Sequence, residues 1–174
     1  ARASLDRLRT DGWRTRMISG DHARVVEAVA RELALTPGDA RGAMTPDDKY
    51  AEVIRSKSSG AVVMVGDGVN DAPALAAASV GIAVHGGAEA SLTAADVYLN
   101  REGVSEIVEL VAGAQRAIRA IKINIGVSIA YNIFAATLSV AGVISPLLAA
   151  IIMPISSLTV LALSVKARTF EEKA

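Results

Sequence analysis

Hydrophobic and polar positions divide the chain near residue 120 into two parts of different character. Up to that point, short apolar runs alternate with amphipathic segments and charged turns. From Ile123 to Val165, by contrast, the chain contains no Asp, Glu, Lys, Arg or His. The first pattern is typical of a soluble α/β domain, and the second is typical of membrane-spanning helices. We therefore expect a soluble part over residues 1–120, a membrane part over residues 121–168, and a short tail of residues 169–174.

The soluble part shows a regular alternation of strand-like and helix-like segments. Short apolar runs predict strands, and apolar residues spaced three or four apart predict helices. The predicted strands are residues 14–18, 40–44, 61–65, 80–84 and 96–99, and the predicted helices are residues 5–9, 22–35, 46–57, an alanine-rich run after residue 71, and 104–121. Asp21 and Thr45 stand where N-caps belong, and Pro46 takes a first helical position. Strands that alternate with helices indicate a parallel sheet covered on both faces.

The uncharged stretch is too long for one membrane span and has the length of two, since each span needs roughly 20 residues. Ser145-Pro146 is a natural turn, which gives spans near residues 123–143 and 147–165. Basic residues flank the stretch on both sides, whereas the turn has no charge; they are Arg116, Arg119, Lys122, Lys166, Arg168 and Lys173. The positive-inside tendency then places the soluble part and both termini in the cytosol. A buried helical hairpin of a soluble protein is the alternative, and it fits the length and the flanking charges poorly.

Composition excludes several other classes of protein. Lys and Arg together number 18, as do Asp and Glu, so no net charge favours nucleic acid binding. The aromatic fraction of 3% leaves no platform on which bases could stack. Since there is no cysteine, the chain has no disulfide and no thiolate metal ligand. The chain opens at Ala1 directly in a helical pattern without a visible secretory signal, and we expect it to be a piece of a longer protein.

A glycine-flanked acidic turn, Gly66-Asp67-Gly68-Val69-Asn70-Asp71, follows the predicted strand of residues 61–65. Open α/β sheets place their ligands at the carboxyl ends of strands. The two glycines allow a sharp turn and a close approach to a ligand, and the two carboxylates are hard oxygen ligands of the kind that Mg²⁺ prefers. An acidic surface turn is the alternative, but such turns rarely combine these residues between a strand and a helix. We therefore predict a Mg²⁺ site here.

Two further loops are expected at the same edge of the sheet. Ser19-Gly20-Asp21 offers a hydroxyl and backbone amides at a helix N-terminus, where phosphate oxygens bind. The loop from Thr45 to Lys49 supplies a lysine, which is a point charge for a developing anion. Each loop alone is a weak signal, because Ser-Gly-Asp is often a plain helix cap and a single lysine is usually solvated. Together with carboxylates that hold Mg²⁺, they form the set that phosphoryl transfer needs.

The three loops resemble the phosphorylation domain of P-type ATPases, which has the haloacid-dehalogenase-like, Rossmann-like α/β fold. The segments that carry the resemblance are Met17 to Asp21, Pro46 to Lys49, Met64 to Leu75, Val80 to Ala83, Gly86-Gly87 and Ala95 to Val97. The acidic turn is highly specific to this family. Two positions depart from the family's pattern, since Ser19 stands where Thr is usual and His22 where Asn is common.

The resemblance implies a role for each matching residue. By the family's pattern, Asp67 is the Mg²⁺ ligand, Asn70 and Asp71 orient the phosphoryl group and its attacking water, Lys49 contacts the aspartyl phosphate, Ser19, Gly20 and Gly68 bind phosphate, and Asp21 faces the nucleotide. Mg²⁺ and ATP are the implied cofactors. The phosphorylated aspartate of the family lies in an Asp-Lys-Thr-Gly-Thr motif, which does not occur in this sequence. We therefore do not expect the chain alone to complete the reaction.

Polar residues inside the predicted spans indicate a second site. Tyr131-Asn132 lies midway along the first span, and Met153, Ser156 and Ser157 share one face of the second. Counted from the turn, Asn132 and Ser157 lie at matching depth. Intramembrane polar clusters are usually functional, although small polar residues also serve helix packing. A thioether with amide and phenol oxygens, and no carboxylate, favours a soft monovalent ion such as Cu(I).

The pattern Tyr131-Asn132 followed by Met153-Pro154-Ile155-Ser156-Ser157 resembles the last two spans of copper-transporting heavy-metal P-type ATPases. Members for zinc or cadmium typically carry a lysine and an aspartate in these spans. The family's Cys-Pro-Cys motif belongs to an upstream span and does not occur in this sequence, and Leu163 replaces an Asn that commonly follows the Met–Ser–Ser positions. Silver in place of copper stays open.

We therefore predict part of an ATP-driven pump that moves Cu(I) out of the cytosol through an aspartyl-phosphate intermediate, in a bacterial inner or plasma membrane. The expected partners are membrane lipid, the metal ion and a cytosolic copper chaperone, with no nucleic acid. A pump for Ag(I) or another heavy metal is one alternative. A membrane-anchored phosphatase of the dehalogenase type is another, but Asp11 and Asp39 lack the Asp-x-Asp pattern that its nucleophile would need. A third is a truncated product that acts only as a binding or regulatory module.

Overall fold

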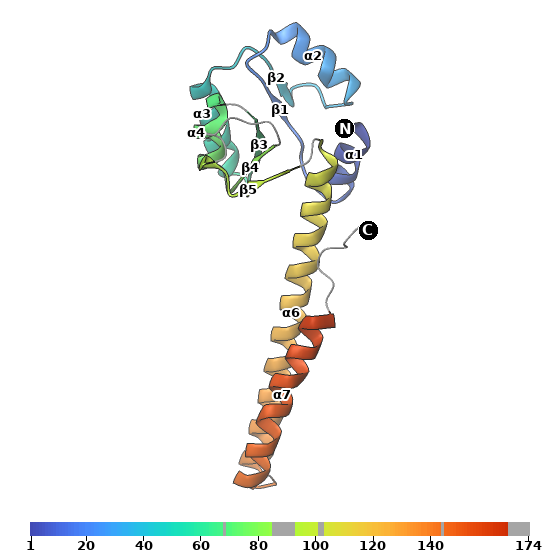
Figure 1. The fold of residues 1–174 in the computed structure, drawn as a ribbon, viewed down its shortest axis with the longest axis vertical. Helices are drawn as coiled ribbons and strands as arrows, with labels where there is room; N and C mark the ends of the chain where they lie inside the picture. The colour runs from blue at the N-terminus through green and yellow to red at the C-terminus, as the bar shows by residue number, and fades with distance from the viewer. Residues whose placement is uncertain (68, 85–92, 101–102, 144, 167–174) are drawn as a thin grey trace. The chain divides into compact units, whose positions relative to one another are not determined.

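Figure 1 shows the computed structural model of the chain, which describes residues 1–174 except 68, 85–92, 101–102, 144 and 167–174. The chain divides into two compact units, Ala1–Val108 and Glu109–Ala174. This division falls earlier than the boundary that the charge pattern predicts near residue 120, because most of the helix predicted over residues 104–121 belongs to the second unit. Each unit is described below by itself.

The first unit alternates short strands and helices. Its elements are α1 (Arg2–Thr10), β1 (Met17–Ile18), α2 (Ala23–Glu32), β2 (Ala40–Arg41), α3 (Pro46–Lys57), β3 (Val63–Gly66), a 3-10 turn η1 (Val69–Asp71), α4 (Ala72–Ala77), β4 (Val80–Ala83) and β5 (Val97–Tyr98). Every predicted strand is found, but each is shorter than the segment that predicts it. One residue outside the pairing is Val62, which packs against the core without belonging to β3.

The starts of two helices test the predicted N-caps. Thr45 caps α3 in a capping box, in which Asp48 N donates to Thr45 Oγ1 at 3.1 Å and Thr45 N donates to Asp48 Oδ2 at 2.9 Å. The prediction for α2 is wrong by one residue. His22 is the N-cap, and its Nδ1 accepts a hydrogen bond from Arg24 N at 3.3 Å. Asp21 bonds instead within its own loop, because its carboxylate accepts from Ser19.

The strands form two parallel sheets rather than the single sheet that the alternating pattern predicts. β1 pairs with β2, and β3, β4 and β5 pair in that order. Among the described residues, β1 has no strand partner except β2, and β3 has none except β4. One edge of β1 and one edge of β3 are therefore unpaired in this part of the chain, and such an edge can accept another strand.

A shared apolar core nevertheless connects the two sheets. Helices α3 and α4 contact each other, and α4 contacts β3 and β4 (Figure 1). The core cluster comprises Val53, Met64, Ala74 and Leu75, and Ile18 of β1 packs against it. Burial of these side chains, of which Leu75 is 1% exposed, holds both sheets on α3.

The second unit consists of two helices, since α6 (Ser105–Val140) continues into it and α7 (Pro146–Lys166) follows. The helix predicted over residues 104–121 and the first predicted span are thus one uninterrupted helix, and α7 matches the second predicted span to within one residue. Among the described residues, α6 is the helix that is long and apolar enough to cross a membrane. The two helices run antiparallel side by side in Figure 1, and Asn124 Nδ2 of α6 donates to Ser164 Oγ of α7 at 2.7 Å.

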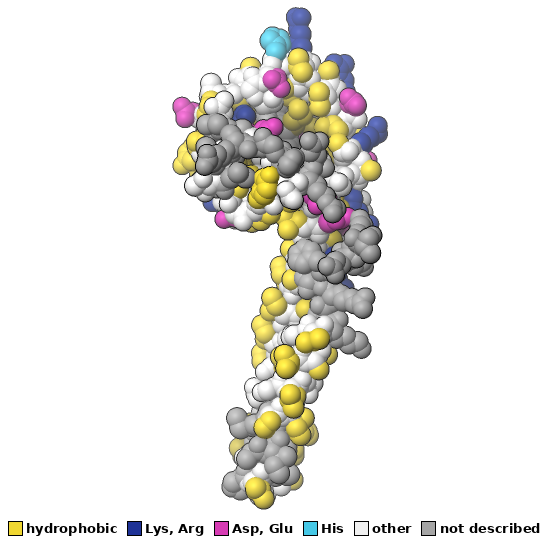
Figure 2. Space-filling view, viewed as in Figure 1, with side chains coloured by type: hydrophobic (Ala, Val, Ile, Leu, Met, Phe, Trp, Pro, Cys, Tyr) yellow, Lys and Arg dark blue, Asp and Glu magenta, His cyan; other side chains and the backbone are white. Residues whose placement is uncertain are grey.

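Apolar side chains cover much of the surface of this second unit. Ile129, Ile133 and Phe134 are 53%, 62% and 64% exposed. In Figure 2, hydrophobic side chains line the two helices, while most Lys, Arg, Asp and Glu side chains lie on the first unit. An apolar surface of this extent needs a cover of lipid or of other protein segments.

Candidate functional site

The acidic turn begins where β3 ends, and its geometry depends on the lack of a side chain at Gly66. A Cβ at Gly66 would lie 2.9 Å from Asp71 Cβ and 3.0 Å from Asp71 Oδ2. Val84 N donates to Gly66 O at 3.1 Å, which fixes the end of the strand. Asp71 can therefore fold back onto the strand, where it is only 8% exposed.

Lys49 reaches the acidic turn from the first turn of α3. Its Nζ lies 2.7 Å from Asp71 Oδ1, and the two side chains are 13% and 11% exposed. The capping box at Thr45 fixes the start of α3, and Lys49 N donates to Thr45 O at 3.0 Å. The structure thus brings together two predicted site residues that are 22 positions apart in the sequence. A mostly buried pair of this kind holds the ammonium group in one place.

Two further side chains of the acidic turn are accessible. The side chains of Asp67 and Asn70 are exposed, whereas Gly68 lies outside the described residues. Within the described ranges, no group of three or more His, Asp or Glu side chains could hold a metal ion. Mg²⁺ commonly binds one or two carboxylates together with phosphate oxygens and waters. An exposed carboxylate such as that of Asp67 fits a Mg²⁺ ion that is shared with phosphate oxygens and waters.

The Ser19-Gly20-Asp21 loop is attached to the segment that leads into α3. Met44 N donates to Ser19 O at 3.0 Å, and Ala43 N donates to Asp21 O at 2.6 Å. Ser19 Oγ donates to Asp21 Oδ2 at 3.0 Å and accepts from Asp21 N at 3.2 Å. Across the described part of the chain, no hydrogen bond joins this loop to the acidic turn. The structure therefore couples the loop to Lys49 through α3 and not directly to Asp67 or Asp71.

The carboxylate of Asp48 stabilises the start of α3. Hydrogen bonds from the Thr45 side chain and then from the Thr45 backbone lower the pKa of Asp48 below its ordinary value, against an opposing effect of burial. Asp48 precedes Lys49 directly, so this ionised cap fixes the turn from which the lysine extends.

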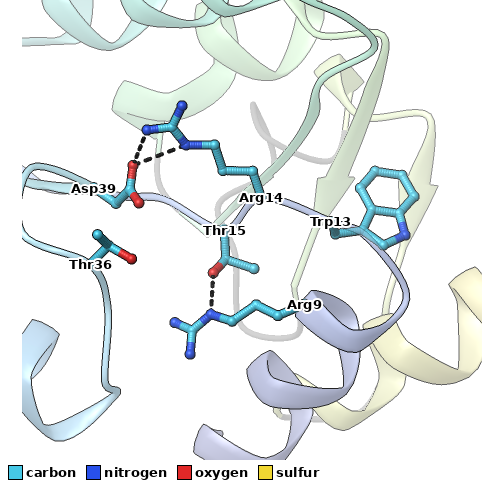
Figure 3. A pocket seen from close by; sticks show the side chains of 6 residues that line it. All are labelled: Arg9, Trp13, Arg14, Thr15, Thr36 and Asp39. Carbon is cyan, nitrogen blue, oxygen red and sulfur yellow. Dashed lines mark hydrogen bonds and ion pairs between the residues drawn. The ribbon is translucent and has the colours of Figure 1, made fainter.

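Two cavities in the first unit are lined by residues other than the predicted site residues. One, of about 370 Å³, is lined by Arg9, Trp13, Arg14, Thr15, Thr36 and Asp39 (Figure 3). In Figure 3, the guanidinium of Arg14 points at Asp39, with its Nη2 2.7 Å from Asp39 Oδ1. The other, of about 400 Å³, is lined by Arg41, Gly42, Ala43, Met44, Asp48, Ala51, Glu52 and Arg55.

Sequence reasoning missed a buried carboxylate at the second cavity. Glu52 is 6% exposed and forms ion pairs with three arginines. Glu52 stands three residues from both Lys49 and Arg55, so the three side chains lie on neighbouring parts of the α3 surface. This spacing is the local sequence feature that could have indicated an ion pair of Glu52. The other two arginines lie far from it in the sequence, so their pairing could not be read from spacing.

The two adjacent polar residues of the first predicted span lie on different faces of α6. Tyr131 is half-buried, whereas the adjacent Asn132 is exposed on α6. Half-buried positions recur every three or four residues along this helix and form one face, namely Ala120, Asn124, Ser128, Tyr131, Ala135 and Leu138. On α7, Ser157 is exposed, and the side chains of Met153 and Ser156 lie outside the described residues.

Comparison with known proteins gives relatives along nearly the whole chain. The haloacid dehalogenase-like hydrolase family matches residues 1–79. A probable copper-exporting P-type ATPase V of Mycobacterium tuberculosis is 37% identical over 167 residues, which are 95% of this chain and 21% of that protein. A manganese-exporting P-type ATPase of Mycobacterium bovis is 40% identical over 161 residues, which are 91% of this chain and 22% of that protein. The chain thus spans about a fifth of the length of these curated relatives.

A solved structure gives the same result for the fold. A crystal structure of a zinc-transporting PIB-type ATPase matches with a TM-score of 0.87 and 27% sequence identity, covering 97% of this chain and 27% of that one. The haloacid-dehalogenase-like fold that the three loops predict is therefore confirmed. The relatives and the solved structure are also P-type ATPases, as the motifs indicate. By sequence and by fold, this chain is therefore homologous to a segment of P-type ATPases that transport metal ions.

Proposed function

We propose that this chain supplies part of the phosphorylation domain and two membrane helices of an ATP-driven pump for heavy-metal ions. The observation that carries the proposal is the mostly buried Lys49–Asp71 pair, with its 2.7 Å contact, in the same turn as the exposed Asp67. A fixed cation next to an accessible carboxylate at the end of a parallel strand is suited to bind and transfer a phosphoryl group.

The unpaired edges of β1 and β3 support a nucleophile from another part of the intact protein. A parallel strand that paired with both edges would join the two sheets into one. Its carboxyl end would then lie between the Ser19 loop and the acidic turn, which follow the carboxyl ends of β1 and β3. We assign the nucleophilic aspartate of the intact protein to that end.

The proposed reaction has two steps. A carboxylate oxygen of the nucleophilic aspartate attacks the γ-phosphorus of ATP, the bond to the β–γ bridging oxygen breaks, and ADP leaves. A water molecule, oriented by Asn70 and Asp71, then attacks the phosphorus of the aspartyl phosphate, and inorganic phosphate leaves with the aspartate restored.

The residues of this chain stabilise the charge that develops on the phosphoryl oxygens. Lys49 supplies a positive charge, and Asp71 holds its ammonium group in place. The amides and hydroxyl of the Ser19 loop bind oxygens from the side of β1, with Asp21 toward the nucleotide. Mg²⁺, held in part by Asp67, would neutralise phosphate charge.

The residues of the two apolar helices support Cu(I) as the transported ion. A thioether and neutral oxygen atoms are available as ligands from Tyr131, Asn132, Met153, Ser156 and Ser157. No Asp or Glu lies between Lys122 and Lys166, so the apolar stretch offers no carboxylate ligand. Ag(I) shares this preference for soft ligands. Because relatives are named for manganese and a structural neighbour for zinc, another heavy metal is the alternative outcome.

The flanking charges support one orientation in the membrane. Basic residues stand at both ends of the apolar stretch and none at the turn, so we propose a hairpin of α6 and α7 with the first unit on the cytosolic side, where ATP is available. A bacterial inner or plasma membrane and delivery of the ion by a cytosolic copper chaperone belong to the same proposal.

Metal-stimulated ATP hydrolysis by the intact protein tests the proposal. Cu(I) should stimulate turnover, and Asp67→Ala or Met153→Ala should abolish the stimulated rate. Asp47→Ala, which removes an exposed carboxylate two residues before Lys49, and Leu158→Ala, on the surface of α7, are matched controls that should keep it. Stimulation by zinc but not Cu(I) would overturn the metal assignment, and full activity of Asp67→Ala would overturn the phosphoryl-transfer site.

A further inference from the structure

Glu52 of α3 forms ion pairs with arginines of three different elements or segments. Its Oε1 lies 2.8 Å from Arg16 Nη1, next to β1. Its Oε2 lies 3.0 Å from Arg41 Nη1 of β2 and 2.8 Å from Arg55 Nη1 of α3. The Glu52 side chain is 8% exposed, so both carboxylate oxygens are used inside the fold.

These contacts attach α3 to the sheet of β1 and β2 at a second point. The first point is the start of the helix, where Met44 N donates to Ser19 O. Gly42 allows this approach, because a Cβ there would lie 2.7 Å from Ala23 Cα. Lys49 lies between the two points of attachment, three residues before Glu52. The distance from the Ser19 loop to the Lys49 ammonium group therefore depends on both points of attachment, the start of α3 and Glu52.

The sheet topology leaves the position of α3 to side-chain contacts. β1 and β3 do not pair in the described residues, and a strand that joined their two sheets would pair with strand edges, not with α3, which carries Lys49. Lys49 is joined to the acidic turn by Asp71, and α3 is joined to the β1–β2 sheet through Glu52. A shift of α3 would move the lysine relative to the loop while leaving each sheet intact.

The arginines indicate that this network serves position more than stability. Their side chains are 39%, 54% and 64% exposed, so each can turn toward water when the carboxylate is removed. Water around the arginines screens these ion pairs, which limits their contribution to stability although Glu52 itself is buried. A variant without the Glu52 carboxylate should therefore still fold, but its α3 should be held less firmly against the β1–β2 sheet.

We propose that Glu52 is a positioning residue for the phosphoryl-transfer site, which it serves by fixing Lys49 relative to the Ser19 loop. The inference rests on the proposed function, because it concerns the phosphate group that these two elements would share. Its effect is on the binding of phosphate and its transition-state analogues, not on metal binding in the membrane.

Inhibition of the intact pump by orthovanadate, a phosphate analogue, tests this role. Glu52→Gln and Arg16→Gln should each raise the vanadate concentration for half-inhibition by about tenfold, equivalent to about 1.4 kcal/mol. Arg55→Gln is the matched control. It removes an exposed arginine from the same carboxylate within α3 but keeps both links to the β1–β2 sheet, so vanadate inhibition should match the wild type.

Thermal unfolding, vanadate inhibition and metal-stimulated hydrolysis together separate the possible outcomes. Thermal unfolding of the variants should stay close to that of the wild type, so that a change in vanadate inhibition reports position. If Glu52→Gln does not fold, Arg16→Gln alone decides the result. Wild-type inhibition in both folded variants would overturn the positioning role while leaving the proposed function intact. A wild-type protein with neither metal-stimulated hydrolysis nor vanadate inhibition would overturn the proposed function and this inference with it.

Discussion

In the unit of residues 1–108, large aliphatic side chains such as Leu75 and Ile82 are 1% exposed, whereas in the unit of residues 109–174 Ile133 and Leu161 are 62% and 59% exposed. The first unit also has ion pairs on buried carboxylates, whereas a hydrogen bond between neutral side chains joins α6 to α7. The first unit thus has an apolar core and buried ion pairs of its own. The second exposes large apolar side chains, and such a surface needs a cover of lipid or of other protein segments.

The largest expected effect is on the Lys49–Asp71 pair. Lys49→Met removes the cation and leaves Asp71 buried without its partner, which should destabilise the first unit by roughly 3–5 kcal/mol. Urea unfolding of the protein in detergent measures this, and Trp13, the single tryptophan of the chain, reports on the first unit. Asp47→Ala should change the unfolding free energy little. An unchanged midpoint for Lys49→Met would show that the pair is solvated.

A leucine-to-alanine substitution in each unit tests the difference in burial between them. Leu75→Ala should lower the free energy of unfolding by about 2–5 kcal/mol, because it opens a cavity in the core around Val53 and Met64. Leu161→Ala, at an exposed position of α7, should have almost no effect in detergent. Equal losses for both variants would contradict the contrast, since they would give α7 a core of its own.

A smaller effect is expected for the hydrogen bond between the two helices. Asn124→Leu removes the donor to Ser164 and should weaken the association of α6 and α7 by roughly 0.6 kcal/mol, the typical contribution of such bonds in membranes. A double-mutant cycle with Ser164→Ala in the intact protein measures the coupling. Additive effects of the two substitutions would show that the contact does not fix the helices.

The smallest expected effect is the pH dependence contributed by Asp48. Its pKa is lowered in the folded state by the Thr45 hydrogen bonds, so its contribution to stability is complete above the unfolded-state pKa of about 4 and is lost as pH falls through the lower, folded-state pKa. Unfolding of the wild type should therefore lose a contribution below pH 4 that Asp48→Asn lacks. If the free energy of unfolding changed identically in the two proteins between pH 5 and pH 2, the predicted contribution of Asp48 would be contradicted.

Local signals account for what the sequence predicts well. The start of α3 is predicted to the residue, because Thr45, Pro46 and Asp48 determine it within one turn. The acidic turn is found for the same reason, since its glycines and carboxylates are adjacent in sequence. The N-cap of α2 is missed by one residue because Asp21 and His22 both carry acceptors, and Ser19 already engages the carboxylate of Asp21.

Contacts between distant residues account for what the sequence does not predict. The division into two sheets depends on which strands pair, and hydrophobic pattern does not specify partners. Arg16 and Glu52 are 36 positions apart, so no spacing rule could join them. The continuity of α6 through Lys122 is different. The change from polar to apolar surroundings does not end a helix, because lysine is a good helix former.

Phosphorylation of the intact protein by ATP labelled at the γ-phosphate is the decisive test of the proposed phosphoryl-transfer site. We expect a metal-dependent acyl phosphate that hydroxylamine cleaves, that does not form in Asp67→Ala, and that forms normally in Asp47→Ala. A protein that hydrolyses ATP without such an intermediate, or one in which Asp67→Ala is labelled as fully as the wild type, would contradict it.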